Sequence, residues 1–189
     1  MTLIYLIRHG RPQSAWGGAD KDPGLDDIGW AQARAVADRL MALDRADRPA
    51  SVISSPLRRC RETAEPMARA LGVEIEIDAA VGEIPTPAGL IEADRPAWLQ
   101  AAMQGDWTDI VGDLDYDRWR RAAATAVAAH PGAAVFSHFV AINGVLSTLG
   151  GDARVITYRP DHTAITALRV GVSGLELVER GAEAGTGVL

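Results

Sequence analysis

Short apolar runs alternate with segments of helical periodicity along most of the chain. Three runs bounded by polar residues, glycine or proline predict buried strands at 3–8, 50–55 and 133–137. Near the C-terminal end, residues 163–170 and 175–180 flank a Gly-Val-Ser-Gly turn. Two apolar runs separated by such a turn predict an antiparallel hairpin.

Two segments between these runs read as amphipathic helices. In residues 26–45, Val36, Leu40 and Leu43 follow the i, i+4, i+7 spacing of one helix face. In residues 115–130 one face is apolar, and it is made of Trp119, Ala122, Ala123, Ala126 and Val127. Both segments are long enough to cover a face of a sheet.

A third helix is expected to begin at Ser55 and Pro56. Serine is a favoured N-cap and proline is favoured at the first helical position, because its missing N–H has no helical partner there. The apolar stripe of this helix consists of Cys60, Ala64, Met67 and Leu71. Pro66 lies inside the stripe and is predicted to kink or split the helix, because its ring removes a backbone hydrogen bond.

Strands that alternate with helices indicate an α/β fold. We expect a three-layer sandwich with a mostly parallel central sheet flanked by helices, and an antiparallel hairpin at the C-terminal end. The length of 189 residues suits one domain spanning residues 1–189. Within it, residues 85–115 are expected to form an insert or lid, and residues 181–189 a flexible tail.

Chemistry-bearing residues follow three of the predicted strands. Arg8-His9-Gly10 ends the first strand, Ser54–Arg59 follows the second, and Ser137-His138 follows the run Ala-Val-Phe. Ligands of parallel sheets bind beyond the carboxyl ends of the strands, so these three places should share one rim. Two arginines, two histidines and two helix N-termini would then meet and form a phosphate-binding cage.

The cage also offers a nucleophile and a proton donor. A neutral imidazole at His9 can attack phosphorus, provided that a backbone carbonyl holds its other nitrogen in the protonated form. Arg8, Arg59 and a protonated His138 could neutralise the phosphoryl oxygens without a metal or other cofactor. Glu83 lies in a loop after the short run Val-Glu-Ile-Glu-Ile. If Ile84 and Pro85 partly bury it, its raised pKa would suit a general acid.

Composition narrows the classes of partner. The formal net charge is −6, which argues against nucleic acid or an anionic membrane surface. Lys21 is the single lysine, whereas arginine supplies the other 18 cationic side chains, so any anion site is built from forked guanidinium groups. The chain has no apolar run long enough to span a membrane and no secretory pattern at its start, so a cytoplasmic location is expected. Cys60 is the single cysteine and is expected to be an inert core residue.

The motifs resemble the histidine phosphatase superfamily, in the branch that includes cofactor-dependent phosphoglycerate mutases. LIRHG is similar to the family's signature, and GLDDIGWAQA, SSPLRRCRETAEP, GEI and FSH follow in the family's order. The resemblance spans roughly residues 3–150. It implies that His9 is phosphorylated, that Arg8, Arg59 and His138 hold the phosphoryl group, and that Glu83 acts as acid and then base.

The departures from the family pattern favour a phosphatase over a mutase. The chain has RHGRPQSAWGG where the mutases have RHGxSxWN, and Phe139-Val140 replaces the Gly-Gly that commonly follows the second histidine. We therefore expect a phosphomonoesterase of the histidine acid phosphatase type acting on a small phosphorylated metabolite. The alternatives are a mutase-type phosphoryl transfer and a catalytically quiet module that binds phosphorylated ligands.

For several other aromatic and histidine residues a structural role is weighed against a role in the site. Trp98, Trp107 and Trp119 are expected to pack in the core or the lid, and His130 to mark a helix end. His162 is a candidate third histidine of the site, although a structural role is favoured. Trp16, close after His9, is a candidate for the wall of the substrate site. The sequence gives no indication of the oligomeric state.

Overall fold

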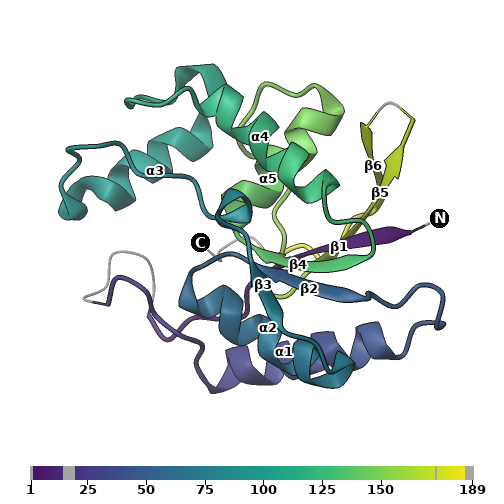
Figure 1. Cartoon of the computed structure of the whole chain (residues 1–189). Helices are drawn as coiled ribbons and strands as arrows, with labels where there is room; N and C mark the ends of the chain where they lie inside the picture. Colours follow the sequence, from purple (N-terminus) through teal and green to yellow (C-terminus); the bar gives the residue numbers. More distant parts are fainter. Residues whose placement is uncertain (1, 15–19, 173, 186–189) are drawn as a thin grey trace.

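The computed structural model describes residues 2–14, 20–172 and 174–185. Six strands form one sheet in the order β3-β2-β4-β1-β5-β6 (Figure 1). The strands are β1 (Leu3–Arg8), β2 (Ser51–Ser54), β3 (Ile75–Ile77), β4 (Ala133–Ser137), β5 (Ile165–Gly171) and β6 (Gly174–Glu179). The α-helices are α1 (Asp27–Met41), α2 (Arg58–Leu71), α3 (Arg95–Gln104), α4 (Tyr116–Ala128) and α5 (Phe139–Gly150). Short 3-10 helices are η1 (Ala79–Val81), η2 (Glu92–Asp94) and η3 (Trp107–Asp109).

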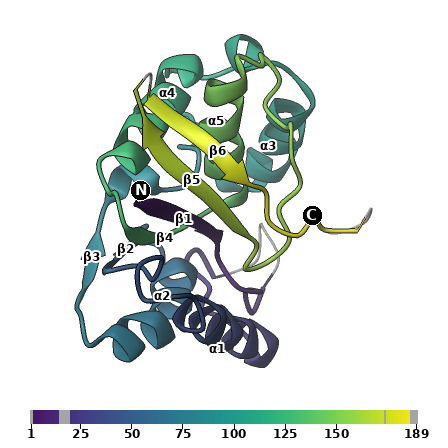
Figure 2. The same cartoon turned by 90° about the vertical axis from the view of Figure 1, so that its right-hand side faces the viewer.

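The pairing of the strands confirms the predicted fold class. β1 and β2 both run parallel to β4, and β3 runs parallel to β2. β5 runs antiparallel to β1, and β6 antiparallel to β5, which is the predicted C-terminal hairpin. α1 and α2 cover one face of the sheet, and α4 and α5 cover the other (Figures 1 and 2). The protein is therefore an α/β sandwich with a mostly parallel centre.

The two faces of the sheet hold two apolar cores, because alternate residues of a strand point to opposite sides. Ile4 and Leu6 of β1 pack with α4 and α5, whereas Tyr5 and Ile7 pack with α1 and α2. Cys60 lies fully buried in the second core, as the helix stripe predicts. A third cluster joins the region of α3 to the start of α5 and includes Trp107, with Trp98 and Trp119 against it. The three tryptophans thus pack as expected.

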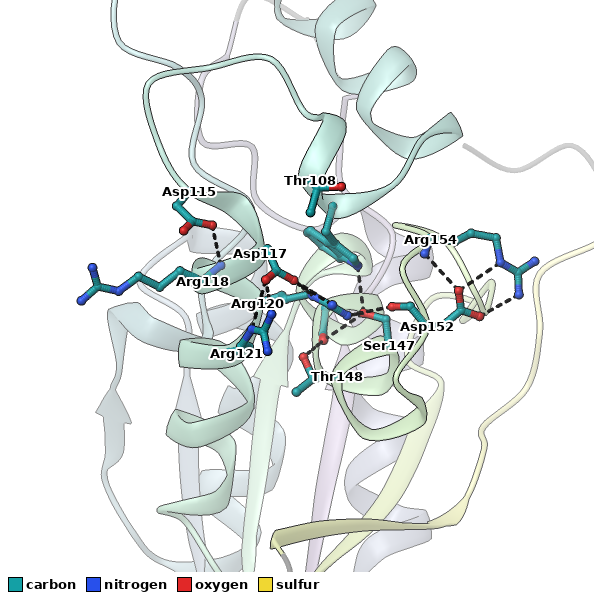
Figure 3. A network of polar contacts seen from close by, with 12 residues as sticks. Thr108, Asp115, Asp117, Arg118, Arg120, Arg121, Ser147, Thr148, Asp152 and Arg154 are labelled. Atoms are coloured by element: carbon teal, nitrogen blue, oxygen red, sulfur yellow. Dashed lines mark hydrogen bonds and ion pairs between the residues drawn. The ribbon is translucent and has the colours of Figure 1, made fainter.

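A polar network ties α4 to α5 beneath η3 (Figure 3). Arg120, only 9% exposed, donates to Asp117 Oδ1 at 2.8 Å and to Ser147 Oγ at 3.1 Å. Trp107 Nε1 donates to the same Ser147 oxygen at 2.9 Å. Arg120 also donates to the carbonyl of Asp152 at 2.9 Å. The buried guanidinium is thereby satisfied, which is the condition for burying a charge at tolerable cost.

The start of α2 differs from the prediction. The helix begins at Arg58 with Leu57 as its N-cap, and not at Ser55 and Pro56. The Ser55 hydroxyl accepts from the Leu57 N–H at 3.3 Å and is also occupied by His138, so it is used in tertiary contacts. The prediction that Pro66 splits the helix is wrong, because α2 continues without interruption from Arg58 to Leu71. Burial of the Met67 stripe outweighs the loss of one backbone hydrogen bond.

Part of the C-terminal segment is hydrogen-bonded to the loop before β5. Ser173 of the hairpin turn and residues 186–189 of the expected flexible tail lie outside the described residues. The Asp161 N–H donates to the Ala182 carbonyl at 3.0 Å, and the Ala184 N–H donates to the Arg159 carbonyl at 2.9 Å. The first part of the expected tail is thus anchored to the loop before β5. No helix in the described part of the chain is long and apolar enough to cross a membrane.

Two glycines bring the loop after β1 against the start of α1. A Cβ on Gly10 would lie 2.8 Å from the Gly29 carbonyl oxygen, and one on Gly29 would lie 3.0 Å from the Arg11 amide nitrogen. Both distances are shorter than side-chain carbons tolerate, and the opposing atoms belong to backbone that cannot easily move. This contact fixes the position of the residues that follow His9.

We predict that Gly29→Ala lowers the free energy of unfolding by about 2 kcal/mol or more, because the new methyl group collides with the backbone of Arg11. Gly150→Ala is the matched control, since Gly150 also lies in a helix but has nothing within 4 Å of the added carbon. The control should change the free energy of unfolding by less than about 1 kcal/mol. Urea unfolding of both variants measures the difference, and equal values for the two would contradict the prediction.

Candidate active site

The carboxyl ends of β1, β2 and β4 meet at one edge of the sheet. The His9 N–H donates to the Ser137 carbonyl at 3.0 Å, and the Ser55 N–H donates to the Phe136 carbonyl at 3.0 Å. These bonds extend the parallel pairing one residue beyond the strands. They place the three predicted segments, Arg8-His9, Ser54–Arg59 and Ser137-His138, on one rim.

His9 is held with one ring nitrogen occupied. Its Nδ1 lies 2.8 Å from the Gly10 carbonyl oxygen, to which only a protonated nitrogen can donate. The tautomer that satisfies this carbonyl leaves Nε2 without a proton. Burial, together with His138, Arg59 and Arg8, holds the pKa of His9 well below its ordinary value. The residue is 4% exposed and is therefore a neutral imidazole with a free lone pair.

A chain of hydrogen bonds joins the loop after β1 to the first turns of α2. The Gly10 N–H donates to Thr63 Oγ1 at 2.9 Å, and this hydroxyl donates to the Arg59 carbonyl at 2.6 Å. Gln32 of α1 supports the same loop, since its Oε1 accepts from the Arg11 N–H at 2.9 Å. The nucleophile candidate and the Arg59 backbone are thus fixed relative to each other.

Arg59 and His138 lie in direct contact. Arg59 Nη2 is 3.1 Å from His138 Nδ1, and His138 Nε2 is 2.7 Å from Ser55 Oγ. The guanidinium can only donate, so Nδ1 accepts and Nε2–H donates to the serine. The rings of His9 and His138 are 5.3 Å apart. The rim therefore brings the two predicted histidines together.

The structure corrects the charge expected on His138. The sequence predicts a protonated His138 beside the phosphoryl oxygens. In the structure, burial and the neighbouring Arg59 and Arg8 hold the pKa of His138 well below its ordinary value. Its Nδ1 already accepts a hydrogen bond from Arg59, which a protonated ring could not do. Without an anion in the cage the imidazole is neutral, and a bound phosphoryl dianion is what would favour its protonation.

Arg8 completes the cationic side of the rim. Its Nη1 donates to the Pro160 carbonyl at 2.9 Å, and its Cζ lies 5.0 Å from the centre of the Phe139 ring. Burial lowers the pKa of Arg8 to about 10, so it stays charged at neutral pH. Among the described residues, neither Arg8 Nε nor Arg59 Nε has a hydrogen-bond partner, although both are buried. Two buried guanidinium N–H groups without acceptors point to an anionic ligand.

Glu83 faces the same rim from the loop after η1. Its Oε1 accepts from the Ile84 N–H at 2.9 Å, and its Oε2 lies 4.0 Å from His138 Nδ1. The side chain is 4% exposed. Burial raises the pKa of Glu83 despite the opposing effects of Ile84 and three arginines. A carboxyl group with a raised pKa beside a cationic cage has the properties of a general acid.

His162 lies at the site, where the sequence favours a structural role. Its ring centre is 5.8 Å from that of His9, and its Nδ1 donates to the His9 carbonyl at 3.3 Å. Thr163, next in sequence, has a φ of 60°. This left-handed conformation is uncommon for a β-branched residue. Burial lowers the pKa of His162 to about 4, so its imidazole is neutral at physiological pH.

A cavity of about 570 Å³ opens from the rim. Its lining includes four residues of the rim, namely Arg8, His9, Glu83 and His162. Helix α3 of the expected insert contributes Pro96, Gln100 and Met103. Trp16, the other candidate for this wall, lies outside the described residues. The described residues contain no group of three or more side chains able to hold a metal ion. His130 does not line this cavity. It follows the end of α4, as predicted, and its Nε2 lies 3.0 Å from Asp78 Oδ2.

Three residues support the site although the sequence does not predict that role for them: Ser55, which is expected there only as a helix cap, Thr63 and Gln32. All three lie within the sequence motifs GLDDIGWAQA and SSPLRRCRETAEP, so the resemblance to the family could have indicated them. Their roles depend on hydrogen bonds across 83, 53 and 21 residues of chain, respectively. Spacing along one element does not reveal bonds of that range.

The protein is thus an α/β sandwich whose sheet edge brings together two buried arginines and two buried histidines. A family model described as the histidine phosphatase superfamily, branch 1, matches residues 4–182. The chain belongs to this superfamily, as its motifs predict.

Individual relatives are matched over part of their length. A bifunctional protein of Mycobacterium tuberculosis is 36% identical over 101 residues, which cover 51% of this chain and 24% of that protein. A metal-independent phosphoserine phosphatase of Arabidopsis thaliana is 38% identical over 69 residues, covering 34% of this chain and 27% of the relative. The match thus spans about a quarter of the length of these curated relatives.

A solved structure matches the fold across nearly the whole chain. The phosphoserine phosphatase of Entamoeba histolytica, in complex with 3-phosphoglyceric acid, superposes with a TM-score of 0.75 at 19% identity. The superposition covers 96% of this chain and 98% of that chain. At this identity the likeness shows the fold that the two proteins share.

We predict a pH-dependent contribution of His162 to stability. Its pKa is about 4 in the folded protein against 6.5 in an unfolded chain, so the unfolded state takes up a proton first as the pH falls. The stability that the neutral histidine contributes is present above pH 6.5 and is lost as the pH falls towards 4. The free energy of unfolding of the wild type should therefore decline relative to His162→Asn through this range. Urea titrations at several pH values measure it, and a constant difference would refute the prediction.

Proposed function

We propose that this protein is a metal-independent phosphatase that hydrolyses a small phosphomonoester through a phosphohistidine on His9. The observation that carries the proposal is the pairing of a bare His9 Nε2 with two buried arginines whose Nε–H groups lack acceptors among the described residues. The arrangement combines a nucleophile with anion-binding groups in one buried place. The similarity to phosphatases supports the same conclusion.

In the first step the lone pair of His9 Nε2 attacks phosphorus. The bond between phosphorus and the ester oxygen breaks, and Glu83 gives its proton to the departing alkoxide. The Gly10 carbonyl stabilises the positive charge that develops on the ring through its bond to Nδ1–H. Arg8 and Arg59 neutralise the equatorial oxygens of the transferred phosphoryl group.

In the second step water attacks phosphorus from the side that the alcohol has left. The Glu83 carboxylate takes the proton of this water, and the bond between phosphorus and His9 Nε2 breaks. Inorganic phosphate forms, His9 regains its lone pair, and Glu83 regains its proton. The burial that raises the pKa of Glu83 favours the protonated form that the next cycle needs.

The proposed substrate is a small phosphorylated metabolite. The cavity of about 570 Å³ suits a ligand of that size. The net charge of −6 disfavours nucleic acid as the partner.

We predict that brief mixing with a phosphomonoester labels His9 with an acid-labile, alkali-stable phosphoryl group. Rapid-quench labelling in the presence of a chelator detects the intermediate. His9→Ala should remove both the label and at least about a thousandfold of the turnover. His130→Ala serves as the control histidine, because His130 does not line the cavity, and it should retain both.

Other results of this experiment would point elsewhere. Turnover without a trapped label on His9 would exclude the phosphohistidine route. Label that passes only to a hydroxyl group of an added phosphomonoester and forms a bisphosphate, with no inorganic phosphate released, would indicate a mutase. Binding without turnover would indicate a phospho-ligand-binding module.

We predict that Glu83→Gln slows alkyl phosphates about a hundredfold or more, because an alkoxide needs a proton to leave. p-Nitrophenyl phosphate carries a leaving group that departs without protonation, so its first step should slow much less. In the wild type, kcat/KM for the alkyl ester should fall as the pH rises through the raised pKa of Glu83. The variant should lack this limb of the profile. Equal slowing of both esters would remove Glu83 from the acid role.

A further inference from the structure

The outer part of the cavity carries opposite charges that already pair with each other. The outer cavity is our name for the part of the lining made by Arg11, Gln13, Asp26, Gln100 and Met103, which are the lining residues, other than His162 and those assigned to the proposed reaction, that carry polar or flexible side chains. Arg11 Nε donates to Asp26 Oδ2 at 2.6 Å. Beyond Arg8, Arg11 is the arginine that lines this cavity.

Asp26 is fixed in place by the fold as well as by Arg11. It is the N-cap of α1, where its Oδ1 accepts from the Gly29 N–H at 2.7 Å. Its own N–H donates to the Arg11 carbonyl at 3.2 Å. The bond from Gly29 and the pairing with Arg11 lower the pKa of Asp26, so the carboxylate stays charged at neutral pH. A ligand cannot displace it from Arg11 without also disturbing the helix cap.

The other groups of the outer cavity are neutral. Gln13 and Gln100 carry amides, Met103 is apolar, and the adjoining His162 is an uncharged imidazole whose Nδ1 is already bonded. Among the described residues that line the cavity, Arg8 and Arg11 are the arginines, and none is a lysine.

We propose that the alcohol part of the preferred phosphomonoester carries hydroxyl groups and no carboxylate. A carboxylate in the outer cavity would lose water, meet the fixed charge of Asp26, and find Arg11 already neutralised. Hydroxyl groups can exchange hydrogen bonds with the amides of Gln13 and Gln100 at little electrostatic cost. This inference rests on the proposed phosphatase function and names its substrate class.

Matched pairs of esters test the proposal directly. Glycerol 3-phosphate and 3-phosphoglycerate differ by a hydroxymethyl group in place of a carboxylate, as do erythritol 4-phosphate and 4-phosphoerythronate. In each pair we expect kcat/KM for phosphate release to be at least about tenfold higher for the alcohol. Equal or faster turnover of the carboxylates would overturn the inference. No phosphate release from any ester, p-nitrophenyl phosphate included, would instead overturn the proposed function.

Asp26→Asn tests the cause of the selectivity. Asparagine caps a helix as well as aspartate does, so the variant keeps α1 while it releases the charge of Arg11. We expect the ratio of kcat/KM for 3-phosphoglycerate to that for glycerol 3-phosphate to rise about tenfold. Adding Arg11→Gln should cancel this gain, because the freed guanidinium is what binds the carboxylate.

Asp27→Asn is the matched control for the charge change. Asp27 is the next residue, is exposed, and lies in the first turn of the same helix. Removing its charge should leave the substrate ratio within about twofold of the wild type, since surface charges are strongly screened. A ratio that stays unchanged in Asp26→Asn, with thermal unfolding showing an intact fold, would overturn the inference. An equal rise in Asp27→Asn would do the same, because it would trace selectivity to net charge alone.

Discussion

The site depends on cationic groups that the sheet buries at one edge without giving them a full set of acceptors. Arg8 and Arg59 are 8% and 6% exposed, and the described residues provide no acceptor for the Nε–H of either. Their charges, together with burial, hold the pKa values of His9 and His138 low. Buried N–H groups without acceptors are unfavourable, and the packed cores on both faces of the sheet must compensate for them. An anion that accepted hydrogen bonds from these groups would remove the cost, and this is the physical basis of the proposed phosphate binding.

The start of α1 links the phosphate-binding rim to the outer cavity. Gly29 packs on Gly10 and so fixes the loop that carries His9. The N–H of the same Gly29 bonds to Asp26, which in turn holds Arg11. One helix N-terminus thereby positions the loop that follows His9 and also holds the carboxylate that pairs with Arg11. The proposed nucleophile and the proposed substrate preference therefore depend on the same few backbone contacts.

The sequence predicted which residues share the rim better than it predicted which residues support them. Residues that follow parallel strands must share an edge, so Arg8, His9 and His138 could be brought together from strand patterns alone. The predicted start of α2 at Ser55 is wrong, because the Ser55 hydroxyl forms a hydrogen bond with His138, 83 residues away in sequence. The sequence favours a structural role for His162 for a similar reason. It reaches His9 through the antiparallel pairing of β5 with β1, and the local sequence carries no mark of that pairing.

The proposed reaction and the proposed substrate preference depend on different parts of the molecule, and this explains why the sequence suggests the first and not the second. Arg8, His9 and His138 lie at the ends of central strands, where strand pairing fixes the positions of the backbone. The outer cavity is instead built from a loop after β1 and from α3, whose Gln100 and Met103 reach it across the insert. No strand register determines those positions. The charge balance between Arg11 and Asp26 became visible only once the two side chains were placed 2.6 Å apart. A substrate preference set by such a pair follows from tertiary geometry and not from any motif.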